Sequence, residues 1–258
     1  MNKIATAERI SERDASDNYV FQRSLLAYRR AAEFVSGDLL EIGTGAGYGI
    51  PLLAPRVKSL LTIDKYMPPI DLVPYHNVEF RQMSASSLGN FAAESFDSVV
   101  TFQVIEHIRN DVAFVREIER LLKPGGKLIL STPNRLMSLT RNPWHVREYT
   151  AEALQSLLGS FFAEVETEGV FGNARVMEYY EKNRRSVERV ARFDPLGLQY
   201  RLPRWMLQIP YDILNRRNRR KLLIENHTLT AGITMDDYAF GPAEERCFDL
   251  FCMAQKNG

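Results

Sequence analysis

The sequence has little cysteine, no long apolar run and almost no charge imbalance. Its two cysteines, Cys247 and Cys252, are an odd number of positions apart within one apolar run. In a strand they would face opposite sides, so neither a disulfide nor a metal knuckle is indicated. No apolar run approaches the roughly 20 residues of a membrane-spanning helix, and the polar first residues are unlike a secretory signal. We therefore expect a protein of a reducing, cytoplasmic setting.

The charges nearly cancel, because 33 basic and 32 acidic residues leave a net charge of +1. This balance argues against a nucleic-acid-binding protein. The basic residues are nevertheless concentrated, since residues 172–243 contain 13 Lys and Arg against 8 Asp and Glu. With 258 residues, of which 45% are hydrophobic, the chain is long enough for one enlarged domain with a sizeable core.

Apolar runs that suit strands alternate with amphipathic patterns that suit helices. This order predicts an α/β fold with a doubly wound, mostly parallel sheet of seven strands and helices on both faces. The strands are expected at 38–42, 59–63 (followed directly by Asp64), 78–81, 96–102, 127–132, 165–170 and 247–254. The helices are expected at 17–35, 111–122, 151–162, 174–193 and 204–223, the last of them interrupted at Pro210.

Some seventy residues separate the last two expected strands, which predicts a helical insertion before the final strand. We divide the chain into an N-terminal helical lid (1–37), a cofactor-binding α/β core (38–171), a helical insertion that caps the substrate (172–242) and a last strand that completes the core (243–258).

The strongest local signal is an apolar strand that runs into four glycines between Gly43 and Gly49. Glycines let a backbone pass close to a ligand where a Cβ would collide. The spacing does not fit the dinucleotide fingerprint, because Tyr48 occupies the position of its last glycine. Asp64, at the end of the second strand, is placed to accept hydrogen bonds from both hydroxyls of a ribose. NAD and S-adenosylmethionine both present that ribose, so these residues alone leave both cofactors open.

Several motifs together resemble the class I S-adenosylmethionine-dependent methyltransferases, particularly the branch of quinone and small-molecule O- and C-methyltransferases. The resemblance rests on the glycine motif 41–49, on Asp64, on the pair Glu106-His107 within residues 101–108, and on the LLKPGGKL run at 121–128. It covers residues 38–172 and extends to 247–256, but it does not reach the insertion. It implies a Rossmann-like methyltransferase fold and S-adenosylmethionine as the cofactor.

The same resemblance implies the cofactor-binding residues. Three glycines would line the methionine end, Glu41 would support their loop, Asp64 would hold the ribose, and Lys65 would flank the adenine. Ser84 stands where many members have an acid beside the adenine amino group, which leaves adenine recognition to a hydroxyl or to backbone groups. The full implied set is Glu41, Gly43, Thr44, Gly45, Gly47, Asp64, Lys65, Met83, Ser84, Ala85 and Gln103.

Some members carry a Glu-x-x-Glu-His motif after the fourth strand and bind a divalent cation there. In this chain the first position of that motif is Gln103, and a neutral amide weakens a hard-cation site by one charge, so we expect no metal. The pair Glu106-His107 would either contact the substrate or only close the loop under the cofactor.

Methyl transfer requires a nucleophile in line with the methyl group, and a base if the nucleophile carries a proton. Histidine is the usual base. His107 and His145 follow the carboxyl ends of the fourth and fifth strands, where α/β sheets place their sites. His145 is either the general base or a loop histidine that pairs with Glu148 for structure. The candidate catalytic residues are His145, His107 and Glu148, and the candidate substrate-binding residues are Tyr19, Arg23, Trp144 and Tyr149.

The acceptor is the least determined part of the sequence reading. No Asn/Asp-Pro-Pro-Tyr motif follows the fourth strand, so methylation of a nucleic-acid base is disfavoured. We expect a small-molecule or sugar acceptor that is methylated on oxygen. One alternative is a lipid-like or prenylated quinone acceptor at a membrane surface, and another is a non-catalytic S-adenosylmethionine-binding or scaffold protein. The basic insertion could contact an anionic membrane or form an ordinary solvated face.

Overall fold

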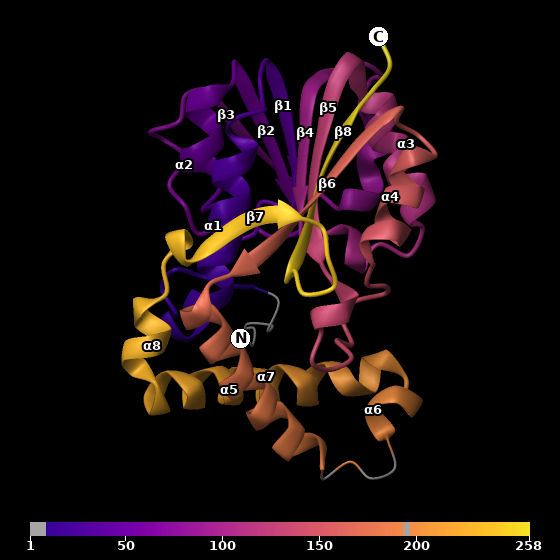
Figure 1. The fold of residues 1–258 in the computed structure, drawn as a ribbon. Helices are drawn as coiled ribbons and strands as arrows, with labels where there is room; N and C mark the ends of the chain where they lie inside the picture. The colour runs from indigo at the N-terminus through magenta and orange to yellow at the C-terminus, as the bar shows by residue number, and fades with distance from the viewer. Residues whose placement is uncertain (1–8, 193, 195–196) are drawn as a thin grey trace.

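A single sheet of eight strands forms the centre of the computed structural model, which describes residues 9–192, 194 and 197–258 (Figure 1). The strand order across the sheet is β3-β2-β1-β4-β5-β8-β6-β7. The strands are β1 Asp38–Ile42, β2 Ser59–Asp64, β3 Val78–Gln82, β4 Phe96–Phe102, β5 Leu122–Pro133, β6 Glu164–Gly172, β7 Tyr238–Pro242 and β8 Asp249–Gln255.

The first five strands pair in parallel, as the alternation of strands and helices predicted. Strand β8 inserts antiparallel between β5 and β6. The prediction of seven strands was wrong, because β7 adds an eighth strand that pairs antiparallel with β6 at the sheet edge. Only five residues long and ending in Gly241-Pro242, it lacks the apolar run that identified the other strands. The last part of the expected insertion therefore belongs to the sheet.

Polar capping residues mark where several helices begin, and stripes of apolar residues determine which side of each helix is buried. Asn110, Thr150 and Asn173 each accept a backbone N–H at the start of a helix. The α-helices are α1 Asn18–Ala31, α2 Ile50–Leu53, α3 Asp111–Leu121, α4 Ala151–Gly159, α5 Ala174–Ala191, α6 Leu198–Arg201, α7 Arg204–Glu225 and α8 His227–Gly232. Short 3₁₀ helices cover Ala15–Asp17, Ala54–Arg56, Ala85–Asn90, Ile105–His107, Arg135–Met137 and Met235–Asp237. None of the helices in the described part of the chain combines the length and the apolarity that a membrane-spanning helix needs.

Helices cover both faces of the sheet, as expected. On one face α3 and α4 pack Val115, Ile118 and Leu154 into a core with β4, β5 and β8. On the other face α1 and α2 bury Tyr28 and Ile50. The second half of α1 is thus part of the core, while residues 1–8 of the expected N-terminal lid lie outside the described residues.

The insertion hangs below the sheet as helices α5 to α8, with α7 running across the lower end of the molecule (Figure 1). The expected interruption of this helix at Pro210 was wrong, because α7 continues through it. A proline removes one helical hydrogen bond, to the carbonyl four residues earlier. Here that carbonyl belongs to Met206, an exposed residue, so water can satisfy it. Phe193, the last residue expected in the preceding helix, lies outside the described residues.

Two arginines of α7 fasten the insertion to the N-terminal segment. Arg216 and Arg219 approach the buried carboxylate of Asp17 to 2.6 and 2.8 Å. Arg216 also donates a hydrogen bond of 2.7 Å to the backbone carbonyl of Arg9. The basic residues of α7 therefore do not form one exposed patch, because Arg216 and Arg219 neutralise a buried acid.

Candidate functional site

The loop between β1 and α2 is closed on one side and open on the other. Gly43 has a backbone φ of +98°, and a Cβ there would lie 2.5 Å from a methyl group of Val104. Gly45 has a φ of +58°, yet no atom lies within 4 Å of the position that its Cβ would take. The left-handed backbone favours glycine at both places, but only Gly45 faces open space. A ligand can therefore approach the backbone at Gly45.

Glu41 supports this loop from below. Its buried carboxylate accepts hydrogen bonds from Tyr28 Oη at 2.7 Å and from Thr62 Oγ1 at 2.5 Å. Thr44 Oγ1 lies 2.6 Å from the same threonine hydroxyl. Burial raises the pKa of Glu41, while the two hydrogen bonds oppose that effect. Glu41 is thus tied to the loop through Thr62 and Thr44, and its role in cofactor binding stays a prediction.

Asp64 presents its carboxylate at the end of β2, beside the open glycine. Oδ2 accepts a hydrogen bond from the backbone N–H of Gly45 at 2.9 Å, and Oδ1 accepts one from Tyr66 at 2.9 Å. Arg9 also approaches Oδ1, at 3.3 Å. A ribose bound here would share Oδ1 with Arg9 or displace it. Sequence reasoning missed Arg9, because no local pattern connects it to a residue 55 positions away.

The remaining residues implied for the cofactor lie along the same edge of the sheet. Met83 donates its N–H to the backbone carbonyl of Asp64 at 2.9 Å, so Met83, Ser84 and Ala85 follow β3 close to the end of β2. Lys65 is exposed. Gln103 has a φ of +56°, an uncommon conformation for a residue with a side chain. Such strain persists where the surroundings enforce it, and it concentrates at functional sites.

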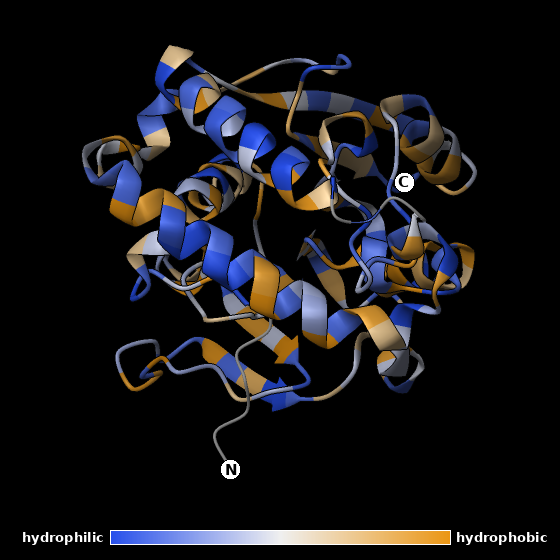
Figure 2. Ribbon diagram, turned by 90° about the horizontal axis from the view of Figure 1, so that it is seen from below, coloured by the Kyte–Doolittle hydropathy of each residue, from blue (hydrophilic) through white to orange (hydrophobic). Residues whose placement is uncertain are grey.

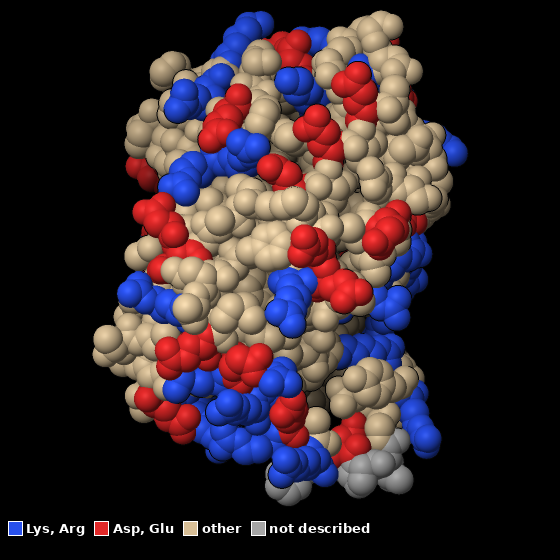
Figure 3. All heavy atoms as spheres, in the orientation of Figure 1, with Lys and Arg blue, Asp and Glu red and all other residues tan. Residues whose placement is uncertain are grey.

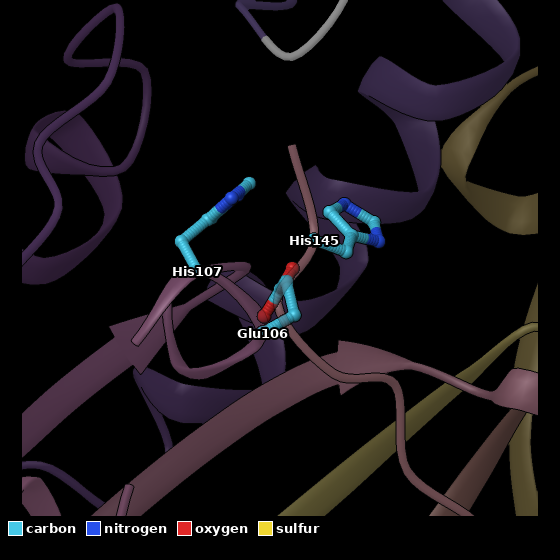
Figure 4. A group of neighbouring side chains, drawn as sticks. All are labelled: Glu106, His107 and His145. Atoms are coloured by element: carbon cyan, nitrogen blue, oxygen red, sulfur yellow. The ribbon is translucent and has the colours of Figure 1, made fainter. Parts of the chain in front are cut away.

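Glu106, His107 and His145 form a compact group beyond β4, with the two histidines on either side of the glutamate (Figure 4). Glu106 is buried, and its Oε2 accepts a hydrogen bond of 2.9 Å from Thr132. Its Oε1 has no hydrogen-bond partner among the described residues. Burial raises the pKa of Glu106, which the nearby histidines oppose. The rings of His107 and His145 have centroids 5.0 Å apart.

The contacts of His145 fix its tautomer. Its Nδ1 lies 2.7 Å from a carboxylate oxygen of Glu148, and its Nε2 lies 2.8 Å from the amide nitrogen of Asn142. The other end of that amide, Oδ1, accepts the N–H of Trp144, so the amide nitrogen is the donor to Nε2. Nδ1 therefore carries the proton and donates to Glu148. An imidazole held in this way has a lone pair at Nε2 that can receive a proton.

Among the described residues, the side chains of Glu106, His107 and His145 form a group that could hold a metal ion. One ligand atom from each lies within 4.8 Å of the others. One carboxylate and two imidazoles suit a transition metal better than a hard cation such as Mg²⁺. The tautomer of His145 leaves only Nε2 for such an ion, and binding there would displace Asn142. That no metal is used stays a prediction from the sequence.

A cavity of about 400 Å³ lies between the core and the insertion, apart from the glycine loop. Four of the residues expected at the active site line it: Tyr19, Arg23, His145 and Glu148. The insertion supplies Tyr179, Tyr180, Asn183, Val187 and Tyr211 to its wall. His145 lines this cavity and contacts His107, which follows β4 at the same edge of the sheet as Asp64. The cluster in Figure 4 thus joins the two regions.

Comparison with known proteins identifies the family. The family model described as a methyltransferase domain matches residues 40–130. A probable S-adenosylmethionine-dependent methyltransferase of Mycolicibacterium smegmatis is 33% identical over 253 residues, which are 95% of this chain and 90% of that protein. The chain belongs to the S-adenosylmethionine-dependent methyltransferases.

Other relatives agree with this assignment. A probable S-adenosylmethionine-dependent methyltransferase of Mycobacterium tuberculosis is 36% identical over 171 residues, covering 63% of this chain and 62% of that protein. Among solved structures, an S-adenosylmethionine-dependent methyltransferase of Thermotoga maritima superposes with a TM-score of 0.56 at 14% identity, over 93% of this chain and 92% of that one. At this identity the likeness shows the fold alone. S-adenosylmethionine is the cofactor of this methyltransferase.

Two residues expected to bind the substrate do not line the cavity of the methyltransferase. Tyr149 is buried, and its hydroxyl donates to Asp111 at 2.7 Å; burial raises its pKa to about 12. Trp144 points its indole N–H at Asp212 of α7, 3.1 Å away. Both side chains fasten the loop that carries His145. Their polar and aromatic character suggested a site, but the same character serves these structural contacts.

Sequence reasoning missed Asp249, the buried partner of Arg23 in the methyltransferase. Arg23 Nε lies 2.6 Å from Asp249 Oδ2, and its guanidinium lies over the rings of Tyr19 and Phe248. Burial raises the pKa of Asp249, against the opposing effects of Arg23 and Gln103. The only available signal was an acid in an otherwise apolar run. Because Arg23 lines the cavity, this pair holds a guanidinium in the cavity wall.

Proposed function

We propose that this methyltransferase transfers the methyl group to an oxygen atom of a small molecule or sugar held in the cavity between core and insertion. The observation that carries the proposal is the pair of His145 and Glu148 in the cavity wall, in the tautomer that a general base requires. The cofactor supplies a methyl group that its sulfonium already activates. The protein must then orient the acceptor and remove the proton of its hydroxyl.

The residues of the chain have distinct roles in that step. His145 Nε2 takes the proton from the acceptor hydroxyl as that hydroxyl replaces the amide of Asn142. Glu148 stabilises the imidazolium that forms, because its carboxylate accepts a hydrogen bond from Nδ1–H, with Nδ1 and Oε1 2.7 Å apart. Ser138 donates to the other oxygen of Glu148 at 2.5 Å and holds the carboxylate in place. This chain of contacts keeps the base oriented before the acceptor arrives.

The composition of the cavity wall supports a polar acceptor with a flat face. Three tyrosines, Tyr19, Tyr179 and Tyr180, offer aromatic surfaces, and the rings of the first two stack at 4.4 Å. Asn183 and Arg23, which also line the cavity, offer hydrogen-bond donors beside these aromatic rings. A few polar groups placed among aromatic walls are typical of sites that orient a small ligand.

A second candidate acceptor is a lipid-like molecule such as a prenylated quinone. One observation favours it: α5 and α7 contribute Val187, Val190, Leu207 and Leu214 to the cavity wall, beside polar residues such as Asn183 and Asn218. An isoprenoid chain would fit against this part of the wall. The polar end near His145 would then receive the methyl group in the same way.

The proposal is tested by supplying labelled S-adenosylmethionine with separate panels of sugars, phenols, prenylated quinones and amines. We expect labelled methyl ethers from the sugar or phenol panel, identified by mass spectrometry. Labelled quinone products alone would select the second candidate, and labelled methylamines would contradict methylation on oxygen. Reactions run with EDTA test the prediction that no metal is used, and we expect an unchanged rate.

A further inference from the structure

Helix α7 presents a second apolar face, directed away from the cavity. Its 22 residues place Trp205, Ile209 and Ile213 at successive steps of four, which brings them to one side of the helix. Their exposed fractions are 72%, 64% and 54%, and the neighbouring Met206 is also exposed. In the view from below, the long helices nearest the reader carry hydrophobic residues among hydrophilic ones (Figure 2).

This outward face is not needed to hold the insertion together. The opposite side of α7 already contributes Leu207 and Tyr211 to the cavity wall and buries Leu222. A surface helix of a soluble domain normally turns one apolar side inward and a polar side outward. Exposed clusters of large apolar side chains mark surfaces that bind a partner. The chemistry around the cluster indicates which partner.

The charges that accompany the apolar residues are positive. Along the same outward side, Arg217 and Arg220 follow Ile213, and both are exposed. Neither joins an ion pair with another described residue, in contrast to Arg216 and Arg219, which turn inward to Asp17. The whole helix contains six basic and two acidic residues. Of these acids Asp212 is buried, and Glu225 lies at the far end near Lys221.

Other basic residues of the insertion are compensated locally. Arg184 on α5 contacts Glu181 and Glu188 at 2.6 and 3.5 Å. Figure 3 shows acidic side chains among the Lys and Arg residues that gather at the lower end of the molecule. The outward side of α7 is different, because Arg217 and Arg220 adjoin apolar side chains and neither forms an ion pair with a described acid; Arg220 acts on Asp14 only at longer range. Its 22 residues form a rod about 33 Å long, which is long enough to lie along a surface.

We propose that the outward side of α7 docks the methyltransferase on an anionic lipid surface. Trp205, Ile209 and Ile213 would enter the boundary between headgroups and acyl chains, and Arg217 and Arg220 would contact the headgroup phosphates. Tryptophan favours this boundary because its ring is apolar and its N–H is polar. A second copy of the chain fits less well, since an isologous contact would bring the exposed Arg217 and Arg220 of both copies to one interface. This docking does not depend on which acceptor the cavity binds.

The experiment is co-sedimentation of the full-length protein with vesicles of phosphatidylglycerol and phosphatidylcholine, or of phosphatidylcholine alone. We expect binding to the anionic vesicles only, with affinity that falls as salt is raised. The double variant Arg217→Gln/Arg220→Gln should bind about 25-fold more weakly, at roughly fivefold for each arginine. The double variant Trp205→Ala/Ile209→Ser should also lose most of its affinity.

Matched controls come from exposed positions on the α/β core. Arg56→Gln/Arg116→Gln removes two exposed arginines, and Val73→Ser/Val112→Ser removes two exposed valines; we expect both to bind as the unmodified protein does. Unchanged thermal unfolding and S-adenosylhomocysteine binding establish that the α7 variants are folded.

Three results would overturn the proposal. The first is that the unmodified protein does not sediment with anionic vesicles, and the second is that the α7 variants sediment as well as the controls do. In the third, light scattering finds a dimer that Trp205→Ala/Ile209→Ser converts to a monomer, with no vesicle binding by either form. That last result would assign the face to self-association.

Discussion

The variant His145→Ala is expected to lower kcat for methyl transfer about a thousandfold, while the Kd of S-adenosylhomocysteine changes less than threefold. The large loss follows because a positioned general base contributes between about a hundredfold and ten-thousandfold to a reaction that needs one. The Kd should hold because His145 lines the cavity and not the glycine loop. The measurement uses an acceptor methylated by the unmodified enzyme, with calorimetry for the Kd.

The pH profile separates a base from a merely structural histidine. In the unmodified enzyme kcat/KM should rise with pH, as general-base catalysis requires, and this rise should be absent from His145→Ala. The variant Glu148→Gln should lose part of the rate, since an amide orients the ring but does not stabilise the imidazolium. His76→Ala, which removes an exposed loop histidine, is the matched control and should retain full activity. A kcat for His145→Ala within threefold of normal would disprove the role of general base.

The variant Asp64→Ala is expected to weaken binding of S-adenosylhomocysteine about 100-fold. Two hydrogen bonds from ribose hydroxyls to a carboxylate contribute about 1.5 kcal/mol each at the low end of the range for charged groups, and together about 3 kcal/mol. The carboxylate also accepts the Gly45 N–H at 2.9 Å, so its removal loosens the loop that faces the ligand. Titration calorimetry measures the effect directly.

The control for this variant is Asp71→Ala, which removes an exposed aspartate in the segment after β2. Its carboxylate accepts only a local backbone N–H, from Val73 at 3.0 Å, so we expect S-adenosylhomocysteine to bind normally. The affinity of Asp64→Asn for S-adenosylhomocysteine should lie between those of Asp64→Ala and Asp71→Ala, because an amide oxygen still accepts one hydrogen bond. Equal affinity in Asp64→Ala and the unmodified protein would show that the ribose does not bind at this carboxylate.

Most of the sheet was predictable because buried parallel strands are short apolar runs with clear ends. Strands β1 and β4 have the predicted bounds, Asp38–Ile42 and Phe96–Phe102, since each run begins near an aspartate and stops at a polar or glycine residue. Strand β7 gave no such signal, because an edge strand can alternate large and small residues and still pair along its backbone. At Pro210 the prediction failed for the opposite reason. A proline is a strong local signal for the end of a helix, but α7 continues through it.

The cofactor region was more accessible to sequence reasoning than the cavity. Gly45 and Asp64 are set by the loop and strand in which they stand, so their local pattern brings them together, and Asp64 accepts the Gly45 N–H. The cavity depends on how the insertion folds back on α1, and no spacing predicts that Tyr179 will stack on Tyr19. The interpretation of Tyr149 shows the same limit. Its position after β5 was read correctly, but the direction of its side chain was fixed by Asp111.

The central claim is that the methyl group passes from the glycine loop into the cavity between core and insertion. The most direct measurement is labelled methyl transfer by Val187→Trp, which fills part of that cavity from α5. The variant should bind S-adenosylhomocysteine within twofold of the unmodified enzyme, because the glycine loop lies apart from the cavity. It should lose at least about tenfold in kcat/KM for the acceptor. Full transfer to that acceptor would contradict the claim and place the acceptor elsewhere.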